Sequence, residues 1–289
     1  MPTRINWCLL GIPDHQGVVH VGGRIGAGLG PSAFREAFSR LKGKNQVRDL
    51  CRDLGDVKNL TQNVEENHAR AAKELSLAQA TCGVSVYVGG GHDHGFSQLQ
   101  GIFDYVASTK KTKPRIGCMN VDAHLDVRKP DPEITSGSPF YLALEAGILS
   151  PDRLIEFGIQ QHCNAPALWA YVEKKKVPVV PFEKLRGGKA VATFKRTLSA
   201  LAKKCDAVVV SFDLDAVAEA FAPGVSAPQA EGFSASEAME MVEVAGREKK
   251  VISLGIFELN PLHDVGGRTA RLAAHLAYHF VLARLPSKS

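Results

Sequence analysis

The sequence predicts an α/β fold whose sheet is mostly parallel, and two observations lead to this fold class. Short apolar runs rich in β-branched residues alternate with helix-like segments along the 289 residues, which is typical of repeated βαβ units. Runs such as Ala207–Val210 are apolar on both faces, as expected for strands that helices cover on both sides. No linker, repeat or low-complexity tract divides the chain, so we expect one domain over residues 1–289.

Each element follows from its local pattern. The β-branched apolar runs predict eight strands, at Asn6–Leu10, Val47–Leu54, Val84–Val88, Arg115–Val121, Arg153–Phe157, Val177–Pro181, Ala207–Phe212 and Val251–Ile256. Helical spacing of apolar residues predicts eight helices, at Ser32–Leu41, Val64–Cys82, Ser97–Ala107, Pro139–Ala146, Pro166–Lys175, Ala190–Lys203, Ser234–Ala245 and Thr269–Leu285. Eight βα units also fit a closed barrel, and periodicity alone does not decide between a barrel and an open sheet. In both folds the functional loops follow the carboxyl ends of the strands.

Composition and charge argue against several classes of function. The net charge is only +5, and Lys and Arg form no concentrated stripe of the kind that binds nucleic acid. No run approaches the ~18 apolar residues of a membrane span, and the N-terminus lacks the pattern of a secretory signal. We therefore expect a cytoplasmic protein with no nucleic-acid or membrane partner. An anionic small substrate fits the charge at least as well, but a charge this small does not decide the partner. The six cysteines are scattered without a Cys-x-x-Cys pair, and we interpret them as free thiols in a reducing compartment.

Two acidic segments follow predicted strands and carry the strongest functional signal. Asp122, His124 and Asp126 alternate after one strand, and Asp213 and Asp215 alternate at the end of another. In an extended chain, residues two apart project to the same side. Aligned carboxylates repel one another unless a cation lies between them. The pattern therefore predicts a metal site.

The number of expected ligands points to two ions. His92 follows the strand Val84–Val88 and adds a second imidazole. The complete set of expected ligands is His92, Asp122, His124, Asp126, Asp213 and Asp215. Six ligands are too many for one catalytic ion that keeps an open position, but they suit two. Oxygen-rich ligands without thiolate favour manganese, with magnesium, iron or zinc as alternatives.

The ordered motifs resemble those of the ureohydrolase family, which holds arginases, agmatinases and formimidoylglutamases. The four motifs are Gly90-Gly91-His92, Asp122-Ala123-His124-Leu125-Asp126, Ser211-Phe212-Asp213-Leu214-Asp215 and Glu258-x-Asn260-Pro261. Gly11-Ile12-Pro13, Gly23-Arg24-x-Gly26 and the segment Gly30–Arg35 are also similar to its N-terminal region. The resemblance implies a three-layer α/β/α sandwich with an eight-stranded, mostly parallel sheet. It also implies two Mn²⁺ ions per subunit at the six positions named above, and a homo-oligomer, either a trimer or a hexamer.

Within the family, the sequence is most similar to the formimidoylglutamase branch. The segments that carry this similarity are Ala222–Pro228, Asp122–Arg128, Ser136–Phe140 and Gly158–Gln161. Arginases carry a Gly-x-x-His segment that supplies a proton-transfer histidine, whereas Ser136–Phe140 contains no histidine. Val217-Ala218-Glu219 also replaces the Asp-Pro that commonly follows the second acidic pair, a mild departure for this branch.

The resemblance implies a metal-dependent hydrolase that cleaves a C–N bond of a linear amidine. The expected reaction converts N-formimidoyl-L-glutamate to L-glutamate and formamide, a step of histidine degradation. Asp126 would orient the attacking water and take its proton, and Glu258 would hold the cationic N–C–N group. Arg128 is a candidate for binding a substrate carboxylate, because guanidinium binds carboxylate bidentately; the alternative is an ion pair with a structural acid.

Two other functions stay open at this level. An agmatinase or another guanidino-acid ureohydrolase would use the same metal site, and a cationic or acidic pocket for the far end of the substrate would distinguish them. A non-catalytic relative could keep the fold as a binding or assembly subunit. The sequence does not assign roles to His15, His94 or His162.

Overall fold

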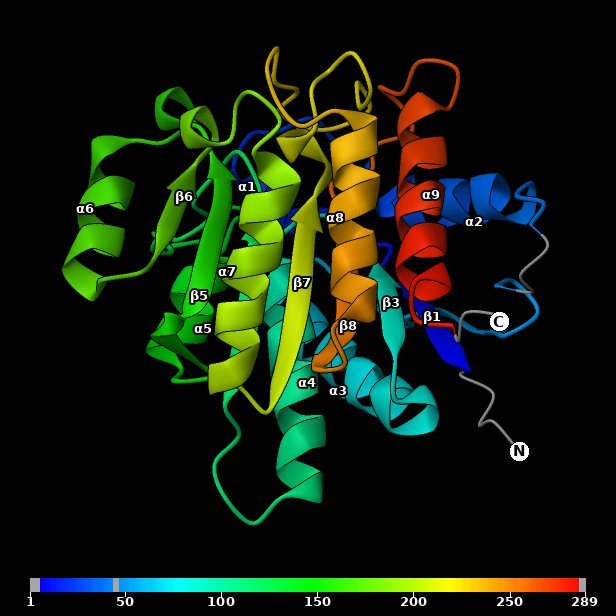
Figure 1. Cartoon of the computed structure of the whole chain (residues 1–289), viewed down its shortest axis with the longest axis horizontal. Coiled ribbons are helices and arrows are strands. Elements are labelled where there is room, and N and C mark those ends of the chain that lie inside the picture. Colours follow the sequence, from blue (N-terminus) through cyan, green and yellow to red (C-terminus); the bar gives the residue numbers. More distant parts are fainter. Residues whose placement is uncertain (1–5, 44–46, 286–289) are drawn as a thin grey trace.

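The computed structural model describes residues 6–43 and 47–285, which contain one open sheet of eight parallel strands. The strands are β1 (Trp7–Gly11), β2 (Cys51–Asp56), β3 (Ser85–Val88), β4 (Ile116–Val121), β5 (Leu149–Ile159), β6 (Val179–Pro181), β7 (Ala207–Asp213) and β8 (Val251–Phe257). Their order is β2-β1-β3-β8-β7-β4-β5-β6, and each paired neighbour runs parallel. Because β2 and β6 lie at free edges, the sheet is not a barrel. Figure 1 shows the arrowheads of β5 and β7 at the upper edge.

Helices cover both faces of this sheet. They are α1 (Gln16–His20), α2 (Gly30–Ser39), α3 (Val64–Cys82), α4 (His94–Thr109), α5 (Pro139–Glu145), α6 (Pro166–Lys175), α7 (Ala190–Lys204), α8 (Ala235–Arg247) and α9 (Arg268–Leu282). The apolar residues of α2, α7, α8 and α9 belong to one core, and those of α3, α4, α5 and α6 belong to the other. Figure 1 shows α7, α8 and α9 side by side across one face. The expected three-layer α/β/α fold is thus confirmed. Within the described residues, no helix combines the length and the apolar character needed to cross a membrane.

The strand β7 shows why runs apolar on both faces predicted this architecture. Val208 and Val210 belong to the core under α7 and α8, whereas Val209 belongs to the core under α3 and α4. All three side chains are fully buried. Because side chains alternate across a strand, a strand covered on both faces needs apolar residues at every position.

The predicted elements are all present, with differences at their ends. The strand expected from Val47 begins only at Cys51, because residues 47–50 form a turn in which the Cys51 amide donates to the Arg48 carbonyl (3.0 Å). The strand β5 begins at Leu149, before the predicted start at Arg153, because Leu149 pairs with Ile116 across a register shift. The helix α1 was missed, since five residues are too few to show a helical period.

The interpretation of the six cysteines as free thiols is wrong for two of them. Cys8 on β1 and Cys82 at the end of α3 form a disulfide, with their Cα atoms 5.7 Å apart. Cys118 and Cys205 are buried free thiols, and Cys51 and Cys163 are partly buried free thiols. The pairing depends on β1 packing against α3, which sequence spacing does not reveal. It also removes the argument from free thiols for a reducing compartment.

Candidate metal centre

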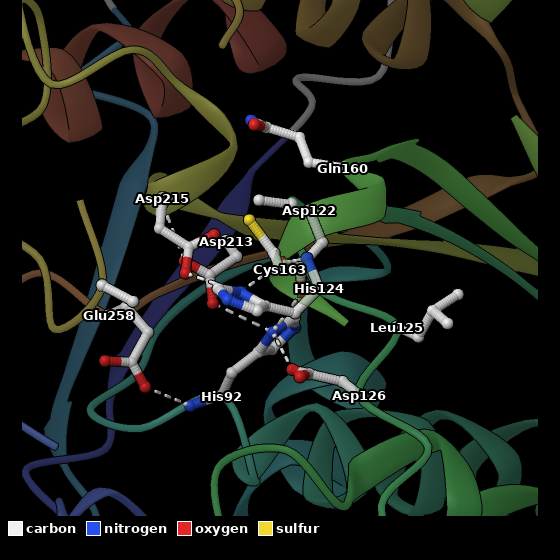
Figure 2. A network of polar contacts seen from close by, with 12 residues as sticks. His92, Asp122, His124, Leu125, Asp126, Gln160, Cys163, Asp213, Asp215 and Glu258 are labelled. Carbon is white, nitrogen blue, oxygen red and sulfur yellow. Dashed lines mark hydrogen bonds and ion pairs between the residues drawn. The ribbon is translucent and has the colours of Figure 1, made fainter. Parts of the chain in front are cut away.

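The predicted site residues lie at the carboxyl ends of four adjacent central strands. In the order β3-β8-β7-β4, these strands end in register, with Val88 opposite Ile256, Phe212 opposite Ile256, and Val121 opposite Phe212. The ends of these strands and the loops that follow them carry all seven of the residues expected to act in metal binding or catalysis, and Figure 2 shows them converging. Four neighbouring strands thus deliver residues from 92 to 258 to a single edge of the sheet.

One half of the cluster forms around His92. Its Nδ1 atom lies 3.0 Å from Asp122 Oδ2, 2.9 Å from Asp126 Oδ2 and 3.1 Å from Asp213 Oδ2. All four residues are buried. Nevertheless Nδ1 makes no well-aligned hydrogen bond with any of these oxygens. One ring nitrogen that faces three carboxylates without hydrogen bonding to them has the geometry of ligands around a cation.

The other half of the cluster forms around His124. Its Nδ1 atom lies 3.0 Å from Asp215 Oδ2 and 3.5 Å from Asp122 Oδ1. Asp122 therefore contributes one oxygen to each half, and the ligand atoms within each half all lie within 4.8 Å of one another. Figure 2 shows both imidazoles pointing at the carboxylates between them. Two groups that share one carboxylate fit a pair of ions, and Asp122 would help to hold both.

The ligands converge for a different reason from the one that predicted them. Only Asp213 is a strand residue: Asp122 to His124 form a bend, and Asp215 lies in a 3₁₀ turn. The side chain of Asp122 accepts a hydrogen bond from the His124 amide (2.7 Å), and Asp213 accepts one from the Asp215 amide (2.8 Å). Asp126 has a left-handed backbone, with φ of 46°. The prediction that these ligands project to one side of an extended strand was therefore wrong. Turns closed by side-chain-to-backbone hydrogen bonds bring the residues together instead.

The charges of the cluster call for cations. Burial and the neighbouring Asp215 carboxylate raise the pKa of Asp213 to about 7, and burial and Asp122 raise the pKa of Asp126 to about 6. Burial also raises the pKa of Asp215 to about 6. Although burial opposes it, the three carboxylates around His92 hold the pKa of that imidazole well above its ordinary value. Without cations these groups would have to retain protons, so the donor set fits metal ions.

A second layer of residues holds the predicted ligands, and most of it escaped the sequence analysis. Ser211 Oγ lies 2.8 Å from His92 Nε2. The Asn164 side chain accepts a hydrogen bond from the Leu125 amide (2.8 Å) and donates one to the Ala123 carbonyl (3.0 Å), which fixes the bend between the ligands. Ser211 stands inside a quoted motif, so its position could have been noticed. Asn164 has no such signal, because it acts across 39 residues of sequence.

Glu258 lies beside the cluster on strained backbone. It follows β8 with φ of 65°, a left-handed conformation that is uncommon for residues other than glycine. Its Oε1 accepts a hydrogen bond from the His92 amide (2.9 Å), whereas Oε2 is buried and has no hydrogen-bond partner in the described part of the chain. Burial and the Asp213 carboxylate raise the pKa of Glu258 well above its ordinary value. An unpartnered carboxylate oxygen at this position is available to a cationic ligand group.

Arg128 and Glu258 line the same cavity of about 210 Å³ as five of the six predicted ligands. Arg128 is exposed, and within the described residues it takes part in no ion pair. A Cβ atom added to Gly137 would lie 3.6 Å from both Arg128 Nε and Asp126 Oδ1, so the guanidinium stands close to the cluster. The alternative of an ion pair with a structural acid is therefore not what the structure shows. A larger hollow of about 590 Å³ lies against α3 and α4 and contains none of the predicted ligands.

His15, His94 and His162, which have no assigned role, do not line the 210 Å³ cavity of the predicted ligands. His94 bonds through Nε2 to Asp14 Oδ2 (3.0 Å) and through Nδ1 to Ser97 Oγ (2.9 Å), within a buried network that includes His68 and Asp93. This network packs the loop before α1 against the loop of His92, since the Gly91 amide donates to the Asp14 carbonyl (3.0 Å).

His15 and His162 also do not line the cavity of the predicted ligands. His15 accepts a weak hydrogen bond from the Gly28 amide (3.3 Å) in the N-terminal loop. His162 is exposed and does not line the cavity.

The fold and the cluster together define an α/β protein built around a candidate two-metal centre at the carboxyl edge of an open parallel sheet. The chain belongs to the Arginase family, whose model matches residues 6–283. It is 34% identical to a formimidoylglutamase of Staphylococcus aureus over 287 residues, which cover 97% of this chain and 86% of the staphylococcal protein.

Solved structures agree with this membership. A Trypanosoma cruzi formiminoglutamase with Mn²⁺ matches with a TM-score of 0.85 and 31% identity, covering 96% of this chain and 93% of that one. The formimidoylglutamase of Bacillus subtilis matches with a TM-score of 0.86 and 25% identity, over 98% of this chain and 88% of that one. The recognition of the family from the ordered motifs is therefore confirmed.

Proposed function

We propose that this chain is a binuclear manganese hydrolase that cleaves N-formimidoyl-L-glutamate to L-glutamate and formamide. The observation that carries the proposal is the placement of Arg128 in the cavity of the metal cluster, where its guanidinium has no ion-pair partner among residues 6–43 and 47–285. A carboxylate of the glutamate portion would be its natural partner, because guanidinium binds carboxylate through two parallel hydrogen bonds. The similarity to formimidoylglutamases over nearly the whole chain supports the same substrate.

The residues divide the work of the reaction among them. His92, Asp122, Asp126 and Asp213 would hold one ion, and Asp122, His124 and Asp215 the other. When bound, the two ions supply Lewis-acid chemistry that acidifies the attacking water at neutral pH. Asp126 accepts the proton of that water and returns it to the departing glutamate nitrogen. Glu258 binds the cationic N–C–N group through its free Oε2. Water adds to the formimidoyl carbon, and the bond from that carbon to the glutamate nitrogen breaks.

The rival functions lack an observation in their favour. Agmatine would present an ammonium group at the far end, but every carboxylate that lines the cavity belongs to the metal cluster or is Glu258. A non-catalytic relative would not need to keep six converging ligands and an unpartnered Glu258 oxygen. Both rivals nevertheless predict distinct outcomes in one experiment.

The test is a substrate screen with protein loaded with Mn²⁺. Formimidoylglutamate, arginine, agmatine and 4-guanidinobutyrate are incubated separately, and formamide and urea are measured. Formamide release from the first compound alone is expected. Urea release from any of the others would overturn the substrate assignment, and failure to bind two equivalents of Mn²⁺ with no turnover would favour the non-catalytic relative.

The proposal also includes the remaining expectations from the sequence. We propose one catalytic domain over residues 1–289, a cytoplasmic location and a trimer or hexamer. Sedimentation equilibrium tests the assembly, and cell fractionation tests the location.

A further inference from the structure

Asn260 forms hydrogen bonds that join the N-terminal glycine-rich loop, residues 22–28, to the segment that carries Glu258. Its amide group donates hydrogen bonds to two successive carbonyls, of Arg24 (2.9 Å) and Ile25 (3.0 Å). Its side-chain oxygen accepts the Leu262 amide (3.2 Å), and its own backbone amide donates to the Gly224 carbonyl (2.8 Å). Asn260 is fully buried, so these contacts satisfy a polar side chain that would otherwise be costly to bury.

Gly23 and Gly26 of the loop approach the groups that hold it so closely that neither position has room for a side chain. Gly26 has φ of 130°, and a Cβ atom added there would lie 2.2 Å from Asn260 Oδ1. Gly23 approaches Ser226 in the same way, since its added Cβ would lie 2.5 Å from Ser226 Oγ. The Ser226 hydroxyl in turn accepts the Arg24 amide (2.9 Å). Residues 23–26 are thus held on both sides by groups that leave no room for a side chain at either glycine.

The fastened loop forms part of the active-site cavity. Val21, Gly23 and Ser226 line the cavity together with Arg128. None of these residues belongs to the metal cluster, so this part of the wall faces the portion of a ligand that extends beyond the ions. The loop continues from α1, whose Gly17 carbonyl accepts the amide of Ser136 (2.9 Å), another residue of the wall.

We propose that Asn260 is a positioning residue: it holds residues 24 and 25 and thereby keeps the adjoining Gly23 and Val21 in the cavity wall that receives the amino-acid end of the substrate. This inference rests on the proposed function and deepens it. Glu258 and Asn260 are two residues apart on one buried segment. The group that binds the amidine and the group that places the far wall therefore keep a fixed separation. A substrate that carries both an amidine and an amino-acid portion at this separation binds more tightly because of the arrangement, whereas formamidine, which has no amino-acid portion, does not.

The test compares Asn260→Asp with the wild-type protein, using formimidoylglutamate and formamidine as substrates. The aspartate is nearly isosteric but sets a carboxylate oxygen against the two carbonyls in place of two donors. We expect the KM for formimidoylglutamate to rise about 10-fold or more, in line with the loss of two hydrogen bonds. The kcat should change by less than about threefold, formamidine hydrolysis should be unchanged, and two Mn²⁺ ions should still bind. Asn63→Asp is the matched control, because the exposed Asn63 side chain only accepts a hydrogen bond, from Glu66.

Limited proteolysis gives a readout that does not depend on activity. Trypsin cleaves after arginine, and the carbonyl of the Arg24–Ile25 bond is one of the two that Asn260 holds. We expect cleavage of that bond, followed by mass spectrometry, to be at least 10-fold faster in Asn260→Asp than in the wild type or Asn63→Asp. Gly26→Ala, which collides with Asn260 Oδ1, should give the same change in KM and cleavage.

The outcomes separate this inference from the proposed function. Unchanged KM and unchanged cleavage in both variants would overturn the role of Asn260. Loss of Mn²⁺ binding or of formamidine hydrolysis in Asn260→Asp would also overturn it, because Asn260 would then support the metal centre. If the wild type does not hydrolyse formimidoylglutamate, the proposed substrate is wrong. Tryptic cleavage of the Arg24–Ile25 bond would still test the second inference, because an unchanged cleavage rate in Asn260→Asp would reject the role of Asn260 in holding the loop.

Discussion

Ser211 fixes the orientation of the His92 imidazole. Its Oγ atom lies 2.8 Å from His92 Nε2, on the side of the ring away from the three carboxylates. The tautomer in which Nε2 donates its hydrogen to Ser211 leaves Nδ1 without a hydrogen on the side of the ring that faces the cluster. This is the outer-layer hydrogen bond that sets the tautomer of a metal-binding histidine.

Replacing Ser211 with alanine should therefore weaken metal binding without unfolding the protein. We expect the Kd for Mn²⁺ to rise by about 10- to 100-fold, which is typical when such an outer hydrogen bond is lost. Calorimetric titration of metal-free protein measures the change. Ser253→Ala is the matched control, because Ser253 is an equally buried serine on β8 that contacts Gln98 instead. An unchanged Kd in Ser211→Ala would show that packing alone orients His92.

Changing Asp126 to Asn should abolish most turnover. The asparagine keeps the size of the side chain but no longer accepts a proton, so kcat should fall by about 100- to 10,000-fold at saturating Mn²⁺. Steady-state release of formamide measures the effect. Asp49→Asn, at an exposed position, should behave as the wild type. Near-normal activity in Asp126→Asn would contradict both roles proposed for that residue.

Changing Glu258 to Gln should reduce catalysis while both ions remain bound. The amide oxygen of glutamine can still accept the His92 amide, as Glu258 Oε1 does, so the local structure should persist. The lost charge faces the substrate, and kcat/KM should fall by about 10- to 100-fold, the usual cost of losing a hydrogen bond to a charged group. Glu219→Gln is a control at an exposed position. Loss of an ion in Glu258→Gln would instead make Glu258 part of the metal site.

Changing Arg128 to Lys should raise the KM for formimidoylglutamate about 10-fold and leave formamidine hydrolysis unchanged. Lysine keeps the charge but cannot form the two parallel hydrogen bonds of a guanidinium. The adjacent Lys129→Ala is the control, since Lys129 is exposed and does not line the cavity. Equal losses with both substrates would mean that Arg128 acts on the metal cluster rather than on the substrate carboxylate.

Metal-free protein should lose stability as the pH rises from 6 to 8. Burial and neighbouring carboxylates raise the pKa of Asp213 to about 7, from 3.8. A carboxyl group with a raised folded-state pKa destabilises the fold as the pH rises from the unfolded-state value of 3.8 to the folded-state value of about 7, and the penalty levels off above that. His92 and His124 act in the same direction, because their raised pKa values stabilise the fold only while they are protonated. Thermal unfolding with a chelator should show a falling Tm, and Mn²⁺-loaded protein should not. A Tm that rises with pH in the metal-free protein would contradict this account.

The fold and the positions of the site residues could be predicted from the sequence, whereas the local geometry that brings the site residues together could not. The central strands were visible because buried parallel strands such as β7 are apolar on both faces. The ligands were visible because Asp and His alternated at strand ends, although the bends that aim them were not. These bends depend on Asn164 and on left-handed backbone at Asp126, and neither follows from local pattern.

Contacts between distant segments account for the remaining misses. The bond between Ser211 and His92 joins residues 119 apart, and the bond from Asn260 to Arg24 joins residues 236 apart. Ser211 and Asn260 both stand inside motifs of the ordered set, at residues 211–215 and 258–261. Their partners become apparent only once β3, β7 and β8 lie beside one another.

The Cys8–Cys82 disulfide and the predicted metal ligands close separate portions of the chain. The disulfide spans residues 8–82, a separation of 74, and encloses α1, the glycine-rich loop and α3. A covalent loop of that length is worth about 4 kcal/mol in the chain-entropy model. The metal ligands begin at His92, so the two cross-links do not overlap. A reductant should therefore destabilise the portion between residues 8 and 82, and a chelator should destabilise the portion that holds the predicted metal ligands. The protein would then contain two chemically independent cross-links, each removed by a different reagent.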